Sequence, residues 1–338
     1  MSWPSSHTYS VVVTASISGL AILSVLRLNR KRKDQNHVAE EASDELNIEG
    51  NEKAQREVAK KMKLVSRESL NKESQTKKAS SSVWSPGAIP PGNFKTPNWL
   101  QTDLSAPIKD AAYSLEEEKY RLVVRAGDRQ VILTLEELQS LGVKQYDRVD
   151  WHCVTGWSYT GLTLFGVPIK RLLSVLGEDL GGDSWTCLYQ VCADGYTCPV
   201  YREDVLQDNT FLALRDASGN LLSYEHGGPR LVFPALWGWK SAKYMTEIQL
   251  LDEFKQGFWE KLMCHDRGRI FDENGRYLQE RWHPTASKSG FHDFMTGMVN
   301  LYHHIFGAKV YGFTMYLGGI LVRMITRPLL RFEHMKKD

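Results

Sequence analysis

The residues best suited to metal chemistry lie in the run WHCVTGWS, residues 151–158. The residues before Cys153 favour a strand and Gly156 favours a turn, so we expect the Cys153 thiol at a sheet edge, facing a cleft. A thiolate is a soft ligand that suits a thiophilic metal. A single cysteine is more often a small core residue, so this run by itself leaves both interpretations open.

A second run of chemically capable residues lies within positions 225–243, EHGGPRLVFP and then WGWKSAK. Glycines let a backbone approach a ligand closely, and Arg230, Lys240 and Lys243 supply cations that fit a phosphate. Successive backbone N–H groups around Ser241–Lys243 would form an anion-binding concavity. The alternative is a Gly- and Pro-rich loop with a solvated basic face.

Together, these runs resemble the oxidoreductase molybdopterin-binding domain shared by sulfite oxidases, plant-type nitrate reductases and the bacterial methionine-sulfoxide reductase catalytic subunit. They are most similar to the small sulfite-oxidase-like bacterial members. The resemblance extends from Pro86 to Pro284 and rests on several motifs in the same order. Those motifs are PPG at 90–92, HCVTGWS at 152–158, EHGGP at 225–229 with Arg230, WKSAK at 239–243, GFWE at 257–260 and HDRG at 265–268.

The resemblance implies a catalytic role for Cys153 as a ligand of molybdenum, with two further sulfurs supplied by the dithiolene of the pterin. It implies two-electron, oxygen-atom-transfer chemistry on a small-molecule substrate, with an unidentified electron-transfer partner. The positions that would hold the pterin and its phosphate are His152, Cys153, His226, Arg230, Lys240, Ser241, Ala242 and Lys243.

Three departures limit what the resemblance implies. The chain after Pro284 is too short and too helical in pattern for the β-sandwich dimerisation domain of sulfite oxidases, and no haem module is recognisable. The Arg-rich run that follows the cysteine in sulfite oxidases and nitrate reductases is replaced by residues 155–158, TGWS, which disfavours sulfite and nitrate as substrates. We expect Trp157, Asp194 and Tyr196 to line the substrate pocket, although each could equally be a packing residue.

The elements that would position these residues are short strands with irregularly spaced helices, which predicts an α+β domain with mixed sheets. One helix should begin at the capping box of Thr134–Glu137 and stop at Gly142, and a second should span Val167–Leu176. The predicted strands are Tyr120–Arg125, Arg148–Val154, Trp185–Cys192, Tyr196–Val200, Phe211–Arg215, Arg230–Pro234 and Thr246–Leu251.

Composition excludes several other functions. The net charge of +2 gives no indication of nucleic-acid binding. The five cysteines lack the even, regular spacing of a disulfide framework, which favours a reducing compartment. Cys187, Cys192 and Cys198 lack the paired spacing of a zinc site, so we interpret them as core thiols.

The N-terminal residues 1–33 predict a transmembrane anchor. Tyr9–Leu26 carries no charge and is, at about 18 residues, just long enough to span a bilayer. Basic residues follow it at once, which keeps the rest of the chain in the cytosol. A cleaved targeting peptide or a buried helix are the alternatives. Residues 34–83 are rich in polar and charged residues and predict a flexible linker, with a transient helix near Glu52–Leu64.

The C-terminal residues 286–338 predict a helical hairpin. Val310–Ile325 is apolar, and Arg323, Arg327 and Arg331 recur every four residues. Such a segment either lies on a membrane as an amphipathic hairpin or packs onto the catalytic domain of residues 84–285.

The sequence thus predicts a membrane-anchored molybdopterin oxidoreductase that faces the cytosol, at the mitochondrial outer membrane or the endoplasmic reticulum. A molybdopterin carrier without turnover, or a membrane scaffold with a degenerate enzyme fold, are the alternatives.

We predict separate contacts with membrane lipid at the two ends of the chain. Deleting the residues before Gln35 should turn an integral protein into a peripheral one, because each C-terminal arginine near an anionic surface contributes only about 1 kcal/mol. Fractionation should show that carbonate or high salt releases the truncated chain and not the full-length chain. A truncated chain that is wholly soluble at low salt would mean that the C-terminal helices pack on the catalytic domain, and one that resists carbonate would mean that they span the bilayer.

Overall fold

The computed structural model describes residues 48–72, 87–100, 114–180, 182, 184–262 and 264–283. All helices and strands in these ranges belong to one compact unit. The predicted anchor at residues 1–33 and the predicted hairpin at 286–338 lie outside the described residues. Among the helices that are described, none is long and apolar enough to cross a membrane.

One five-stranded sheet has the order β3-β2-β10-β6-β7. Strands β2 and β10 pair in parallel, and the other neighbours pair antiparallel. Leu122, Leu133 and Leu188 lie on one face of this sheet and are fully buried. The strands span Arg121–Ala126 (β2), Arg129–Thr134 (β3), Cys187–Cys192 (β6), Thr197–Tyr201 (β7) and Met245–Leu251 (β10).

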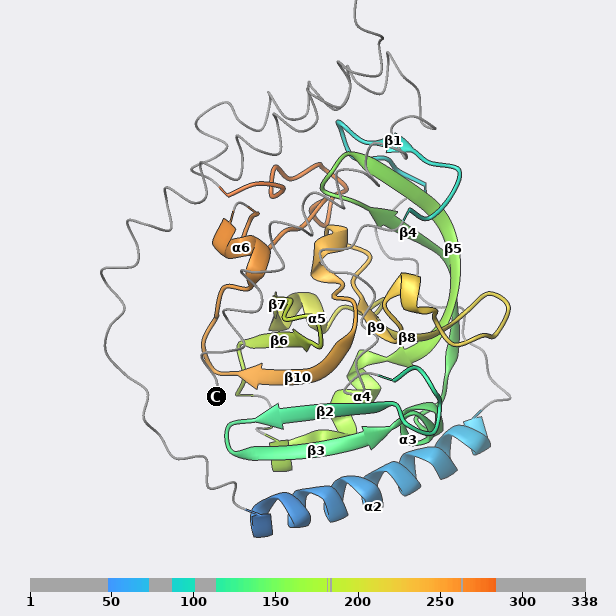
Figure 1. Cartoon of the computed structure of the whole chain (residues 1–338), viewed down its shortest axis with the longest axis vertical. Coiled ribbons are helices and arrows are strands. Elements are labelled where there is room, and N and C mark those ends of the chain that lie inside the picture. The colour runs from blue at the N-terminus through green and yellow to red at the C-terminus, as the bar shows by residue number, and fades with distance from the viewer. Residues whose placement is uncertain are drawn as a thin grey trace, which may run out of the picture. The chain divides into compact units, whose positions relative to one another are not determined.

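The other five-stranded sheet is built around the long strand β5, whose neighbours are β1, β4 and β8, with β9 beyond β8 (Figure 1). Strand β1 pairs with β5 in parallel, whereas β4 and β8 pair with it antiparallel. Both sheets are therefore mixed, and the predicted mixed-sheet α+β class is confirmed. The strands span Phe94–Lys95 (β1), Lys144–His152 (β4), Trp157–Pro168 (β5), Phe211–Asp216 (β8) and Arg230–Val232 (β9).

Short helices connect these strands, and two of them confirm sequence predictions. The Thr134 hydroxyl accepts from the N–H of Glu137, and the Glu137 carboxylate accepts from the N–H of Thr134, which completes the capping box. Helix α4 ends at Gly177, as predicted. The helices span Ile48–Lys72 (α2), Leu135–Ser140 (α3), Ile169–Leu176 (α4), Arg202–Val205 (α5) and Phe258–Leu262 (α6), with 3-10 turns at Gly177–Leu180 (η1), Tyr224–His226 (η2) and Gly238–Lys240 (η3).

The structure corrects the prediction of a flexible linker over part of its length. Residues Ile48–Lys72 form helix α2, which packs against β3, α4 and η1 (Figure 1). Ala54, Val58 and Met62 recur every four residues and are buried. Gln55 donates to the carbonyl of Ile132 and accepts from its N–H, so the helix satisfies backbone groups on the open edge of β3.

We predict that Met62→Ala lowers the free energy of unfolding by about 2–4 kcal/mol, because it removes a side chain from a packed interface. Thermal or urea unfolding would measure this. Lys63→Ala, at the exposed neighbouring position, is the matched control and should change the stability by less than about 0.5 kcal/mol. Equal stability of both variants would restore the interpretation of this segment as a flexible linker.

Candidate functional site

Cys153 lies directly after β4, in a tight turn that leads into β5. Its N–H donates to the carbonyl of Trp157 (2.9 Å), and its carbonyl accepts from Gly156 (3.1 Å), whose φ of +100° favours glycine. The sulfur lies 3.1 Å from the hydroxyl of Thr155. Cys153 is 8% exposed, whereas the other four cysteines are at most 1% exposed. Cys153 is therefore the most exposed of the five cysteines, and it is the one that its sequence motif indicates as a metal ligand.

The structure brings the two chemically capable runs together. A Cβ atom on Gly238 would lie 2.7 Å from Nε1 of Trp151 and 3.2 Å from the carbonyl oxygen of His152. Only a glycine allows 3-10 turn η3 to lie so close to the end of β4. The guanidinium of Arg230 lies 4.7 Å from the ring of Trp151, which adds a cation–π contact between the two runs.

Arg230 holds the second run in one conformation. It is 4% exposed, and its Nε donates to the hydroxyl of Ser241 (2.9 Å). Its two terminal nitrogens donate to the carbonyls of His226 (2.8 Å) and Ser241. Ala242, also buried, donates its N–H to the side-chain oxygen of Gln190 (3.2 Å). The backbone around Ser241 and Ala242 is therefore fixed by side chains from two other strands.

Of the residues in this run that the sequence assigns to the cofactor, His226 and Lys243 are the two that are not buried. The His226 ring stacks on Trp99 at 4.3 Å, and its Nδ1 is 3.0 Å from the hydroxyl of Ser223. Burial, Arg230 and Lys243 together lower the pKa of His226, so its imidazole is neutral near pH 7. Lys243 is half-exposed, and its ammonium donates to the carbonyl of Glu225 (2.6 Å). Lys243 is thus the cation of this run that an incoming phosphate can reach.

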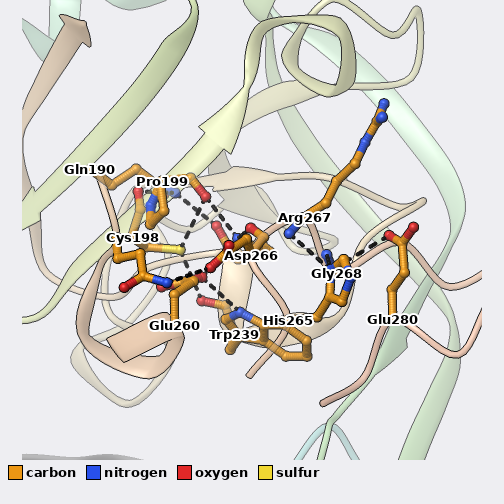
Figure 2. A network of polar contacts seen from close by, with 12 residues as sticks. Gln190, Cys198, Pro199, Trp239, Glu260, His265, Asp266, Arg267, Gly268 and Glu280 are labelled. Atoms are coloured by element: carbon orange, nitrogen blue, oxygen red, sulfur yellow. Dashed lines mark hydrogen bonds and ion pairs between the residues drawn. The ribbon is translucent and has the colours of Figure 1, made fainter. Parts of the chain in front are cut away.

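Lys240 does not occupy the place that the sequence predicted for it. Its side chain is 0% exposed, and its ammonium donates to Glu260 (2.7 Å), to the carbonyl of Pro199 (3.0 Å) and to the carbonyl of Asp266 (2.6 Å). Figure 2 shows these acceptors grouped beside Trp239. Burial alone would lower the pKa of Lys240, but Glu260 raises it, so the ammonium stays charged. All three of its protons are used, so Lys240 is a structural cation.

His152 also turns inward. It is 1% exposed, and its Nδ1 lies 2.8 Å from the hydroxyl of Ser158, its partner in the β4–β5 register. Burial lowers the pKa of His152 to about 4, which leaves the ring neutral at physiological pH. Consecutive strand residues face opposite sides, so His152 faces away from Trp151 and Arg230. It supports the turn from within the core.

The three residues expected to line a substrate pocket do not share one environment. Trp157 is 1% exposed, and Tyr196 is 5% exposed with its hydroxyl donating to the carbonyl of Trp239 (2.7 Å). Asp194 lies in the β6–β7 turn, where it is half-exposed and accepts from the N–H of Tyr196 (3.1 Å). Tyr196 and Trp157 are packing residues here, which leaves Asp194 as the member of this set that is open to solvent.

Two residues that the sequence did not indicate hold the Cys153 turn. The Asn93 amide donates to the carbonyl of Trp157 (2.9 Å) and lies 3.2 Å from the carbonyl of Cys153. Arg281, which is 1% exposed, donates to the carbonyl of Val154 (2.8 Å) and to the Asn93 side-chain oxygen (3.1 Å). Both lie far from Cys153 in the sequence, and both act on backbone atoms, so no motif marks them.

The site fits a cofactor that brings its own ligands. No group of three or more His, Cys, Asp or Glu side chains suited to a metal occurs among the described residues. Cys153 is a single thiol, so a metal held there would need further ligands from its cofactor. The indole N–H groups of Trp157 and Trp237 are buried without an acceptor in the described part of the chain. The soft thiolate of Cys153 and the cation of Lys243 suit a molybdenum–pterin group, whose dithiolene supplies further sulfur.

Known proteins agree with this chemistry. Residues 108–259 match the oxidoreductase molybdopterin binding domain family. YuiH of Bacillus subtilis strain 168, an oxidoreductase whose activity is uncharacterised, is 32% identical over 188 residues, covering 54% of this chain and 88% of YuiH. The chain belongs to the oxidoreductase molybdopterin-binding domain family.

Two further matches are more limited. A protein of Azospira oryzae, provisionally named protein-methionine-sulfoxide reductase subunit YedZ1, is 34% identical to this molybdopterin-binding domain over 129 residues. That match covers 38% of this chain and 47% of the Azospira protein. The sulfane dehydrogenase SoxCD from Paracoccus pantotrophus is 20% identical, with a TM-score of 0.38 over 51% of this chain and 47% of that one. So low a TM-score adds no support, and membership in the family rests on the sequence matches.

We predict opposite effects of replacing the two lysines of the WKSAK run. Lys240→Met should cost about 3–5 kcal/mol of stability, because it leaves Glu260 as a buried unpaired charge. Lys243→Ala should leave the melting temperature unchanged and weaken pterin retention about ten- to a hundredfold, because a charge-assisted hydrogen bond contributes about 1.5–3 kcal/mol.

Thermal melting and pterin content, measured on the same samples, test this pair of predictions. The double variant Lys240→Met/Glu260→Leu is the control, and it should recover stability because no buried charge is left alone. If Lys240→Met melts like the wild type and loses its pterin, Lys240 is a cofactor ligand, as the sequence alone had predicted.

Proposed function

We propose that this protein is a molybdenum-cofactor-dependent oxidoreductase with Cys153 as the protein ligand of the metal. The observation that carries the proposal is the meeting of the Cys153 turn with the Arg230–Lys243 run through the close approach of Gly238 to Trp151. When bound, the cofactor would supply two-electron redox chemistry with oxygen-atom transfer.

The protein's own groups would bind and orient this cofactor. Cys153 would hold the metal as a thiolate, and a deprotonated sulfur can only accept, so the Thr155 hydroxyl at 3.1 Å would donate to it. Lys243 would bind the phosphate by charge, and neutral His226 would hydrogen-bond to the pterin. The hydrogen bonds between Arg230 and Ser241 would keep this part of the cofactor site rigid, which limits reorganisation during the reaction.

We infer a small substrate without a full negative charge. Positions 154–158 carry no cation that could bind an oxyanion next to Cys153. The Azospira relative is named for a sulfoxide substrate, which makes a sulfoxide the first compound to test. Asp194, half-exposed on the β6–β7 turn, is the candidate for a contact with it. An electron-transfer partner and a cytosol-facing membrane anchor at the N-terminus remain parts of this proposal.

We predict that Cys153→Ser abolishes turnover while leaving most of the pterin bound. An alcohol is a harder and much less acidic ligand than a thiol, so the electronic state of the metal should change. Molybdenum and pterin content, the Mo(V) resonance spectrum, and sulfoxide reduction with a reduced viologen dye would be measured on the purified full-length protein.

Cys187→Ser is the matched control, because it makes the same change at a buried thiol outside the site. It should lower stability and leave the Mo(V) spectrum unchanged. Turnover by Cys153→Ser at the wild-type rate would refute the ligand assignment. Wild-type protein that holds molybdenum and never reacts with any donor would instead be a cofactor carrier, and wild-type protein that holds neither metal nor pterin would be a scaffold.

A further inference from the structure

A buried arginine from beyond the family match reaches the Cys153 turn. Arg281 lies after residue 259, where the match to the family ends. Its Nε donates to the carbonyl of Val154 (2.8 Å), the residue next to Cys153, and a terminal nitrogen donates to the side-chain oxygen of Asn93 (3.1 Å). Burying a guanidinium is costly, so these contacts must be made with good geometry.

Asn93 passes this restraint on to both ends of the turn. Its amide nitrogen lies 2.9 Å from the carbonyl of Trp157, 3.2 Å from that of Cys153 and 3.0 Å from the hydroxyl of Ser158. An amide side chain could present either its oxygen or its nitrogen to these groups. Because Arg281 only donates, it selects the orientation in which the oxygen faces Arg281 and the nitrogen faces the turn.

Arg281 is itself held in place by aromatic rings. Its guanidinium lies 4.9 Å from the ring of Trp237 and 5.8 Å from the ring of Trp282. Trp282 forms a β-bridge with Cys264, which ties this segment to the chain that follows α6. The planar group is therefore restrained on its faces by rings and on its edge by hydrogen bonds.

We propose that Arg281 is a positioning residue for the metal ligand: it fixes the Cys153 turn through Val154 and Asn93, without touching cofactor or substrate. The functional consequence of this restraint, which is the orientation of the thiolate toward the metal, rests on the proposed function. The restraint on the turn exists without the metal, so it can be tested separately.

The first test uses the full-length chain produced in a host that makes no molybdopterin. Iodoacetamide labelling with peptide mapping reports on Cys153, because the other cysteines are at most 1% exposed. Arg281→Lys keeps the charge and loses the two-pronged geometry, so Cys153 should be labelled faster. The expected increase in the labelling rate is about tenfold, which corresponds to the loss of one hydrogen bond. Labelling at the wild-type rate would overturn the proposal.

The matched control is Arg267→Lys, in the same segment, where the arginine binds Asp204 in two-pronged fashion (2.7 and 3.0 Å) away from the turn. It should label like the wild type. If Arg281→Lys does not fold, Asn93→Asp takes its place, because aspartate still accepts from Arg281 and cannot donate to the turn. Faster labelling of Asn93→Asp supports the proposal, and an unchanged rate overturns it.

A second measurement on cofactor-loaded protein separates positioning from loss of structure. Arg281→Lys should keep its molybdenum and show an altered Mo(V) spectrum, because the sulfur is presented differently. A variant with less metal and an unaltered spectrum has lost only stability, and this would overturn the positioning role. If wild type binds no molybdenum while labelling follows the expected pattern, the proposed function fails and the restraint by Arg281 stands.

Discussion

The burial of one cation determines how the site is assembled. The side chain of Lys240 is 0% exposed. Burying an ion costs on the order of several kcal/mol unless its hydrogen bonds are complete. Its acceptors come from three segments, Pro199 on β7, Glu260 on α6 and Asp266 in the loop beyond it. All three segments therefore hold η3 in its position. Since η3 also carries Gly238, the contacts of Lys240 also fix the position of the backbone against which the end of β4 packs.

A metal ligand on a turn needs support that a strand residue would not need. Cys153 lies one residue beyond the end of β4, where the regular ladder of the sheet stops, although its N–H still donates to the carbonyl of Trp157 at the start of β5 (2.9 Å). Asn93 and Arg281 replace that ladder with hydrogen bonds to the carbonyls of the turn, and β1 adds a further bond from Phe94 to Gly156 (3.1 Å). A displacement of about 1 Å is enough to impair a metal or catalytic site, so such bracing has a functional consequence.

Sequence reasoning succeeded where a residue type and its local pattern determine the outcome, as in the capping box that starts α3. Sequence reasoning missed β5, because the glycines of that strand interrupt the expected alternation. One of them is Gly166, where a Cβ atom would collide with the carbonyl oxygen of Leu212. In place of α2 it predicted a linker with only a transient helix near Glu52–Leu64, because the charges of that helix outnumber the three apolar residues that pack. It assigned Lys240 to the cofactor because composition does not distinguish a buried cation from a solvated one. Asn93 acts on backbone atoms, and no side-chain pattern records such a role.

The cations around the turn also bear on what the site can accept. Arg230 and Arg281 are 4% and 1% exposed, and each donates to neutral oxygens, which do not cancel its charge. Charges in a poorly solvated interior act over longer distances than charges in water, so both guanidinium groups add to the positive potential at Cys153. Were the proposed cofactor bound, this potential would favour its anionic ligands. Because both arginines are buried, neither can contact an incoming oxyanion. To bind an oxyanion, the site would need a cation within positions 154–158.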